Sequence, residues 1–73
     1  MKKVYRMKDL DCANCAAKME RAVQKIDGVT GASVSFMAQK LTIEGDEARF
    51  DEIVREAVRA CKKVDADCEI ILK

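Results

Sequence analysis

Hydrophobic residues in the first part of the chain follow two different periods. Tyr5 and Met7 alternate with basic residues, and this period of two predicts a short strand with one buried face. The next apolar positions are spaced as on one face of a helix; they are Cys15, Met19, Ala22, Val23 and Ile26. Asp27 and Gly28 follow, and they end the predicted helix.

The same two periods return in the second part of the chain. Residues 32–36 and 40–44 each alternate between apolar and small or polar residues, and the break at residues 37–39 predicts a hairpin. A second helical spacing follows; its apolar positions are Phe50, Ile53, Val54, Ala57, Val58 and Cys61. After a turn over residues 62–66, alternation over residues 68–72 predicts a last strand. Its apolar face comprises Cys68, Ile70 and Leu72.

The order of these elements predicts the fold class. Strand, helix, strand, strand, helix, strand is the order of an α+β protein with the split βαβ, or ferredoxin-like, βαββαβ arrangement. We expect an antiparallel four-stranded sheet with two helices on one face and, from right-handed crossovers, the strand order 4-1-3-2. This topology places the loop after the first strand, the hairpin and the last turn at one end, with all four Cys near it. We expect residues 1–73 to form one domain.

Composition narrows the classes of function. The chain has 14 Lys and Arg against 13 Asp and Glu, so no basic field exists to hold a nucleic acid. Its longest uncharged stretch, residues 28–39, is too short and too polar to span a membrane. The N-terminus does not resemble a signal peptide, which predicts a cytoplasmic protein. In that compartment the four Cys would remain thiols, available for metal or redox chemistry.

Candidate chemistry is concentrated in Cys12-Ala13-Asn14-Cys15, where the first strand gives way to the first helix. A Cys-x-x-Cys spacing lets two sulfurs converge on one metal ion, and the N-H groups of a helix N-terminus favour thiolates. The same features suit disulfide exchange, so a small dithiol oxidoreductase stays an alternative. The chain has no Pro, however, whereas thioredoxin-like proteins place a proline against their Cys pair. We therefore favour metal binding through Cys12 and Cys15.

Three segments carry a resemblance to a known family: residues 11–20, residues 28–36 and residues 40–45. Together they resemble the heavy-metal-associated domain of metallochaperones and of P1B-type metal-transporting ATPases. Asp9-Leu10 stands where the family usually has Gly-Met, and the Gly-aromatic pair that follows the family's second helix is missing. The resemblance implies a metal loop at Cys12 and Cys15 on a ferredoxin-like fold.

Asp11, which precedes the first Cys, bears on the choice of metal. A neutral residue at this position resembles the family's copper(I) domains, whereas Asp resembles its zinc, cadmium and lead domains. Two thiolates nearly satisfy linear Cu(I), but a divalent ion wants more ligands and accepts a carboxylate oxygen. We predict Asp11 as a third ligand and Zn(II), Cd(II) or Pb(II) over Cu(I). The alternative role for Asp11 is that of N-cap of the first helix.

The other Cys and Met residues are predicted mainly as core. Cys61 and Cys68 continue apolar faces, so a buried, inert thiol is the default for each. The sharper hypothesis is that Cys68, beside the end of the first strand, completes a three-sulfur site for Cd(II) or Pb(II). Met7 and Met19 are expected to pack in the core, and Leu10 to anchor the loop from beneath.

An open site with two or three protein ligands predicts transfer of the ion by ligand exchange with a Cys-containing donor or acceptor. The resemblance implies a cytosolic N-terminal domain of a P-type efflux ATPase, whose transmembrane part or another domain would be the partner. A free copper(I) metallochaperone is the alternative. No catalytic constellation is present, so the domain itself is not predicted to be an enzyme. We expect an apo monomer, and two copies sharing one ion through four Cys are plausible at high concentration.

Overall fold

Four strands and two long helices follow one another in the predicted order. The computed structural model describes residues 1–72, and Lys73, the last residue of the predicted domain, lies outside them. The elements are β1 (Lys2–Lys8), α1 (Ala13–Gln24), β2 (Val29–Ser35), β3 (Lys40–Gly45), a 3-10 turn η1 (Glu47–Arg49), α2 (Phe50–Val64) and β4 (Glu69–Ile71). Among these described elements, no helix has both the length and the apolar character needed to cross a bilayer.

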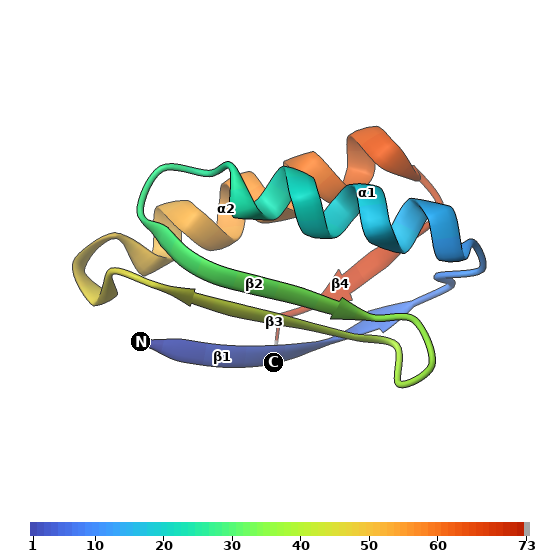
Figure 1. Ribbon diagram of the computed structural model, residues 1–73, viewed down its shortest axis with the longest axis horizontal. Helices are drawn as coiled ribbons and strands as arrows, with labels where there is room; N and C mark the ends of the chain where they lie inside the picture. Colours follow the sequence, from blue (N-terminus) through green and yellow to red (C-terminus); the bar gives the residue numbers. More distant parts are fainter. Residues whose placement is uncertain (73) are drawn as a thin grey trace.

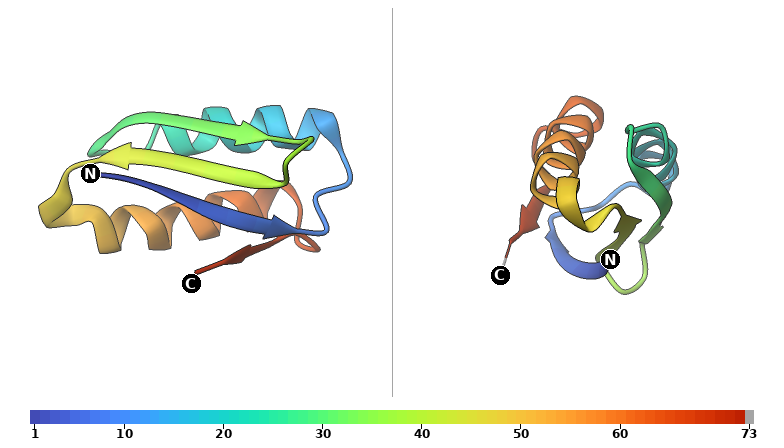
Figure 2. Two further views of the ribbon diagram at one scale, coloured as in Figure 1. Left: turned by 90° about the horizontal axis from the view of Figure 1, so that it is seen from below. Right: turned by 90° about the vertical axis from the view of Figure 1, so that its left-hand side faces the viewer.

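The strands form one antiparallel sheet covered on one face by both helices. Its spatial order is β2-β3-β1-β4, which is the predicted 4-1-3-2 order read from the opposite edge. Neighbouring strands are antiparallel throughout. Figure 1 shows the sheet below the two helices, and the right-hand view of Figure 2 shows both helices on the same side of it. The predicted α+β ferredoxin-like class is therefore confirmed.

The core lies between the sheet and the helices, where the apolar face of the strands packs against the apolar faces of the two helices. Tyr5 of β1 pairs with Leu41 of β3, and both point toward the helices. Met7 and Met19 are 4% and 0% exposed, as predicted for core residues. Leu72 was expected to be buried, but it is 54% exposed. The reason is that β4 pairs with β1 over only three positions, and Leu72 lies beyond the end of that pairing.

The helix boundaries differ from the predicted ones at their C-termini. α1 ends at Gln24 with Lys25 as its C-cap, so Ile26 packs from the following turn and not from the helix. α2 continues to Val64, which shortens the predicted turn over residues 62–66. The N-H of Asp65 still donates to the carbonyl of Cys61, at 2.9 Å. The extended helix brings Asp65 to the end of the molecule that carries the Cys-x-x-Cys segment.

The outer edge of β2 is partnered by side chains of α1. The backbone N-H of Val34 donates to Glu20 Oε2 at 3.0 Å, and Gln24 Nε2 donates to the carbonyl oxygen of Ala32 at 3.0 Å. Glu20 and Gln24 are four residues apart and therefore lie on one face of α1. Two main-chain groups that an edge strand would otherwise leave open are thus satisfied within the chain.

Candidate metal centre

The loop that joins β1 to α1 comprises residues 9–12, and we call it the β1–α1 loop. It lies at the right-hand end of Figure 1, together with the β2–β3 turn and the C-terminal end of α2. The strand ends in a sharp turn at Asp9, whose φ is 62°. Leu10 then points into the core and is 2% exposed, which confirms its predicted role as an anchor. Asp11 is exposed beyond it.

Cys12 begins the helix, and Cys15 lies in its first turn. Cys12 is the N-cap of α1, and its sulfur accepts a hydrogen bond from the Cys15 N-H at 3.2 Å. The Cys12 carbonyl accepts the first helical hydrogen bond, from the Ala16 N-H at 3.0 Å. The alternative that Asp11 caps the helix is therefore wrong, because the helix begins at Ala13 and the position before it belongs to Cys12. Asp11 therefore does not cap the helix.

The two thiols at the start of α1 differ in acidity. The pKa of Cys12 is lowered because the Cys15 thiol donates to its sulfur and the backbone N-H groups of Cys15 and Asn14 also point toward it. The pKa of Cys15 is raised because its thiol is the donor in that pair, with burial and the charge on Cys12 adding to the effect. Cys12 is therefore the first to become a thiolate, and the thiolate is the form that binds metal.

Two charged residues near the pair had not been singled out by the sequence pattern. The Asp65 carboxylate raises the pKa of both Cys12 and Cys15, while the Lys18 ammonium lowers that of Cys15. Lys18 could have been anticipated, since it follows Cys15 by one helical turn. Asp65 could not, because it lies 50 residues along the chain from Cys15 and reaches the site only through the end of α2. It adds negative charge beside a prospective cation.

Cys61 and Cys68 are buried beneath the same end of the molecule. Each is 1% exposed, in agreement with the prediction that both belong to the core. Burial raises the pKa of Cys61 to about 11, helped by the nearby Cys68. Burial also raises the pKa of Cys68, and the charges of Asp65, Asp9 and Asp11 add to it. Cys68 directly precedes Glu69, which pairs with Lys8 at the end of β1, so it lies near the β1–α1 loop.

The structure brings together part of the predicted ligand set. Cys12 and Cys15 are adjacent, half-buried and unbridged, so both sulfurs are available to an ion. Asp11 is exposed next to Cys12, and Cys68 is buried under the loop. Over residues 1–72, no three side chains of the Cys, Asp or Glu type are gathered into a single ion-holding group. The geometry present is thus that of a two-thiol site with further donors nearby.

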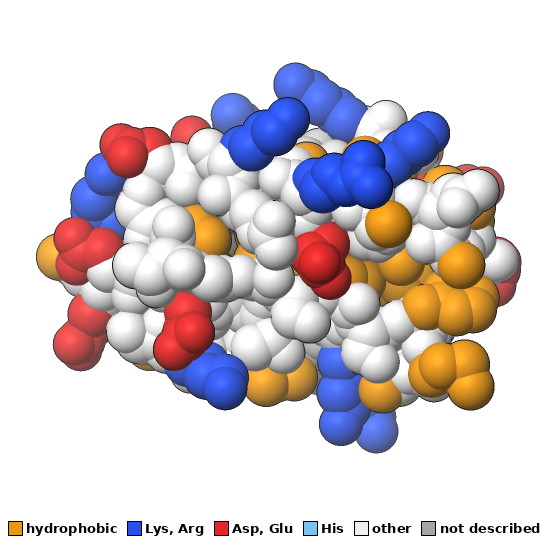
Figure 3. Space-filling model, viewed as in Figure 1, with side chains coloured by type: hydrophobic (Ala, Val, Ile, Leu, Met, Phe, Trp, Pro, Cys, Tyr) orange, Lys and Arg blue, Asp and Glu red, His pale blue; other side chains and the backbone are white. Residues whose placement is uncertain are grey.

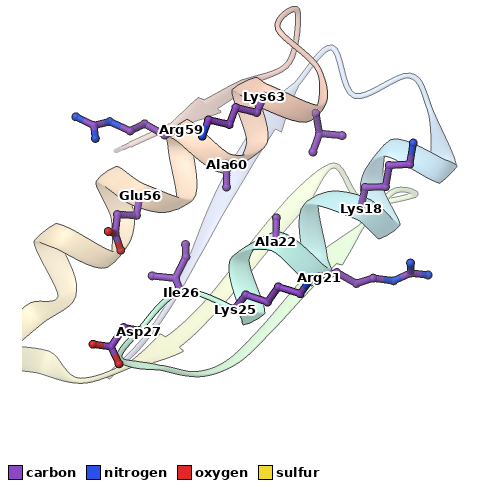
Figure 4. A pocket seen from close by; sticks show the side chains of 11 residues that line it. Lys18, Arg21, Ala22, Lys25, Ile26, Asp27, Glu56, Arg59, Ala60 and Lys63 are labelled. Atoms are coloured by element: carbon purple, nitrogen blue, oxygen red, sulfur yellow. The ribbon is translucent and has the colours of Figure 1, made fainter.

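A groove of about 780 Å³ runs between the two helices on the face opposite the sheet. Ala22, Ile26 and Ala60 line its floor (Figure 4). Its walls carry two carboxylates, from Asp27 and Glu56, against five cationic side chains, and we call this surface the basic groove. The cationic side chains are those of Lys18, Arg21, Lys25, Arg59 and Lys63. Figure 3 shows several Lys and Arg side chains over the helices, with Asp and Glu visible at both ends of the molecule. The net charge of +1 is therefore compatible with a local gathering of basic side chains.

Comparison with known families agrees with this site. The model of the family described as heavy-metal-associated domain matches residues 4–63, which include the β1–α1 loop, α1 and all of α2 except its last residue. The chain belongs to the heavy-metal-associated domain family. As a heavy-metal-associated domain it is a metal-binding module, and the matched segment contains both Cys12 and Cys15.

Curated relatives of this heavy-metal-associated domain are metal-transporting ATPases. It is 56% identical over 45 residues to a probable cadmium-transporting ATPase of Listeria monocytogenes. The matched segment covers 62% of this chain and 6% of the relative. It is 34% identical over 65 residues to the cadmium, zinc and cobalt-transporting ATPase of Bacillus subtilis strain 168, covering 89% of this chain and 9% of the relative. The chain therefore spans less than a tenth of the length of these relatives.

Solved structures with the same fold include both ATPase domains and metallochaperones. The NMR solution structure of the ZiaAN sub mutant has a TM-score of 0.78 at 23% identity, covering 100% of this chain and 97% of that one. The CopZ metallochaperone has a TM-score of 0.73 at 22% identity, covering 97% and 100%. At these identities the likeness establishes the ferredoxin-like fold of the heavy-metal-associated domain, and it leaves the metal open.

Proposed function

We propose that this heavy-metal-associated domain binds Zn(II), Cd(II) or Pb(II) through Cys12 and Cys15, with Asp11 as third ligand, and passes the ion on by ligand exchange. The observation that carries this proposal is the half-buried Cys12–Cys15 pair at the N-terminus of α1, with a free carboxylate beside it. The chain's similarity to a probable cadmium-transporting ATPase and to a cadmium, zinc and cobalt-transporting ATPase supports a divalent ion.

The charge of the ligand set favours a divalent cation. Two thiolates and the Asp11 carboxylate would leave one negative charge around Zn(II) but two around Cu(I). The extra negative charge is costly in a partly desolvated loop. Zn(II) and Cd(II) also prefer more than two ligands, whereas two thiolates nearly satisfy Cu(I). Asp65, which lies near both thiols, adds to this preference for higher positive charge.

Cys68 is a second candidate for the third ligand, in a site made of three sulfurs. Support comes from its place at the start of the β4 segment, which pairs with the end of β1, and from the charges of Asp9 and Asp11 that act on it. Its burial makes it less accessible than Asp11, because the loop would have to move before its sulfur could reach the ion. Whichever of Asp11 and Cys68 is the third ligand, every thiol that binds the ion must first lose its proton.

Ligand exchange requires no catalytic base. An incoming thiolate of the partner would bind the metal, after which Cys12 or Cys15 would leave and take up a proton from water. Repetition of this step moves the ion without its release into solution, in the way that thiolates replace one another in disulfide exchange. The half-exposed position of both sulfurs suits such stepwise replacement.

The partner that we propose is another Cys-containing part of a metal-efflux P-type ATPase, with this chain as a cytosolic N-terminal domain of that protein. The share of the relatives that the chain matches, 6% to 9%, is what a small domain of a large transporter would give. The basic groove begins at Lys18, close to Cys15, and therefore suits a partner with acidic residues around its own Cys pair.

Metal selectivity tests the proposed ligand set. We expect Asp11→Ala to weaken Zn(II) and Cd(II) binding by about 10- to 100-fold while leaving Cu(I) binding unchanged or stronger. The measurement is titration of the reduced apo protein against a competing chelator, with the sulfur-to-cadmium absorption followed in parallel. Cys68→Ser is titrated alongside: an unchanged cadmium absorption and affinity would eliminate the three-sulfur site. If the wild type prefers Cu(I) and Asp11→Ala changes nothing, the copper(I) metallochaperone replaces this proposal.

Charge reversal in the basic groove tests the partner surface. We expect the double variant Arg59→Glu, Lys63→Glu to slow cadmium transfer to a Cys-x-x-Cys peptide flanked by Glu by about 10-fold at low salt, because electrostatic steering is lost. Transfer to the same peptide flanked by Ser should not change. The matched control, Lys2→Glu with Lys3→Glu on β1, makes the same change of charge outside the groove. Equal slowing by both variants would show a net-charge effect without a docking surface.

A further inference from the structure

The side chain of Gln39 joins the β2–β3 turn to the β1–α1 loop. Its Oε1 accepts from the Leu10 N-H at 3.1 Å, and its Nε2 donates to the Leu10 carbonyl at 2.7 Å. The same Nε2 donates to the Phe36 carbonyl at 2.8 Å, which fixes the side chain within its own turn. One amide therefore holds both main-chain groups of a residue that lies 29 positions away.

The backbone of Gln39 contributes to the same junction. Its carbonyl accepts from the Met7 N-H at 2.7 Å, next to the end of β1. Its φ of 54° lies in the left-handed region, which a non-glycine residue adopts only at a cost that its surroundings must offset. Asp9, on the other side of the junction, is also left-handed, with φ at 62°. The loop is thus held from the main chain of β1 to the buried Leu10, immediately before Asp11.

We propose that Gln39 is a positioning residue of the metal centre, which fixes the β1–α1 loop so that Asp11 stays within reach of an ion on Cys12 and Cys15. This inference rests on the proposed function, since it concerns the third ligand of that site. Gln39 does not touch the ion. It acts through Leu10, whose main chain leads directly into Asp11.

The two classes of metal depend on this junction to different degrees. Cys12 and Cys15 belong to the first turn of α1 and are oriented by helical hydrogen bonds that do not involve Gln39. A Cu(I) ion that needs only these two sulfurs should be indifferent to the position of Leu10. A divalent ion that also needs Asp11 should bind more weakly when the loop is released. Gln39 would therefore contribute to selectivity between metals.

The variant Gln39→Asn tests this proposal. Asn retains an amide and tolerates the left-handed backbone, but it is one methylene shorter and cannot hold Leu10 from the same position. We expect Zn(II) and Cd(II) affinity to fall by about 10-fold or more, in the range seen for groups that orient metal ligands, with Cu(I) affinity within about 2-fold. In the apo protein, the Leu10 amide should exchange with solvent at least about 10-fold faster. Gln39→Gly, in which a positive φ carries no cost, provides a second variant if Asn does not fold.

A control separates positioning from general loss of stability. Asp46→Ala removes a solvent-exposed hydrogen bond, from the Ala48 N-H to Asp46 Oδ1 at 3.1 Å, at the opposite end of the molecule. It should leave the ratio of Zn(II) to Cu(I) affinity unchanged. If Gln39→Asn leaves that ratio and the Leu10 exchange rate as in the wild type, or if Asp46→Ala shifts the ratio equally, the inference is overturned. Failure of the wild type itself to bind divalent metals would instead overturn the proposed function, while Leu10 exchange would still test the junction.

Discussion

Cys12→Ser is expected to lower the affinity for Cd(II) and Zn(II) by about 10²- to 10³-fold. Structural zinc sites gain about 10–16 kcal/mol from four ligands, which is about 2.5–4 kcal/mol for each. The fold should survive this change, because Cys12 is the N-cap of α1 and Ser is one of the preferred N-cap residues. Competition with a chelator measures the affinity, and thermal unfolding of the apo protein measures the fold. Loss of binding without loss of stability is the expected pair of results.

Asn14→Ser is the matched control for that experiment. Asn14 lies between the two Cys and is exposed, and we expect affinity within about 2-fold of the wild type, as for other surface positions. If Cys12→Ser keeps its Cd(II) affinity, the ion must be held elsewhere, and the assignment of Cys12 as a ligand is wrong. A fall in stability equal to that of a core substitution would instead assign Cys12 a structural role.

Leu10→Ala should have the largest effect on folding among the residues of the β1–α1 loop. Leu10 is 2% exposed, and truncation of a buried Leu costs about 2–5 kcal/mol from lost burial and the cavity left behind. For a chain of 73 residues this is a large share of the total, which is typically about 0.05–0.15 kcal/mol per residue. Urea unfolding of the reduced apo protein gives the free energy of unfolding.

Leu72→Ala makes the same chemical change at an exposed position. Leu72 is 54% exposed, so the expected change in the free energy of unfolding is within about 0.5 kcal/mol. A similar loss of unfolding free energy in Leu10→Ala and Leu72→Ala would mean that the β1–α1 loop is not anchored through Leu10. The comparison also tests whether β4 ends where its pairing with β1 ends.

Periodicity was sufficient to predict the fold, because each element buries one face and the period of that face depends on the type of element. Met7 on a strand and Met19 on a helix were placed in the core by this reasoning, and both are there. The strand order followed from the handedness of βαβ crossovers. The position of Leu72 was wrong because alternation continues past the last hydrogen bond of β4, and a pattern of residue types does not record where pairing stops.

The candidate site was only partly predictable. Cys12 and Cys15 are close in sequence, so their spacing already implied that their sulfurs could converge. The N-cap role of Cys12 was missed, because Asp11, the only residue considered for it, has a side chain that can equally accept a hydrogen bond at a helix start. Gln39 and Asp65 had no local signal, because each reaches the site from a distant element through the packing of the whole domain. Residues of this kind become visible only when the fold is known.

The partnered edge of β2 affects how several copies of this chain would meet one another. An open edge strand is a template on which a second molecule can add a strand, and such additions lead to aggregation. The side chains of Glu20 and Gln24 already hydrogen-bond the Val34 N-H and the Ala32 carbonyl on this edge. A second molecule would have to displace both side chains before it could extend the sheet. Association of copies through the β2 edge is thereby opposed at these two positions, so strand addition should favour β4, the other edge of the sheet.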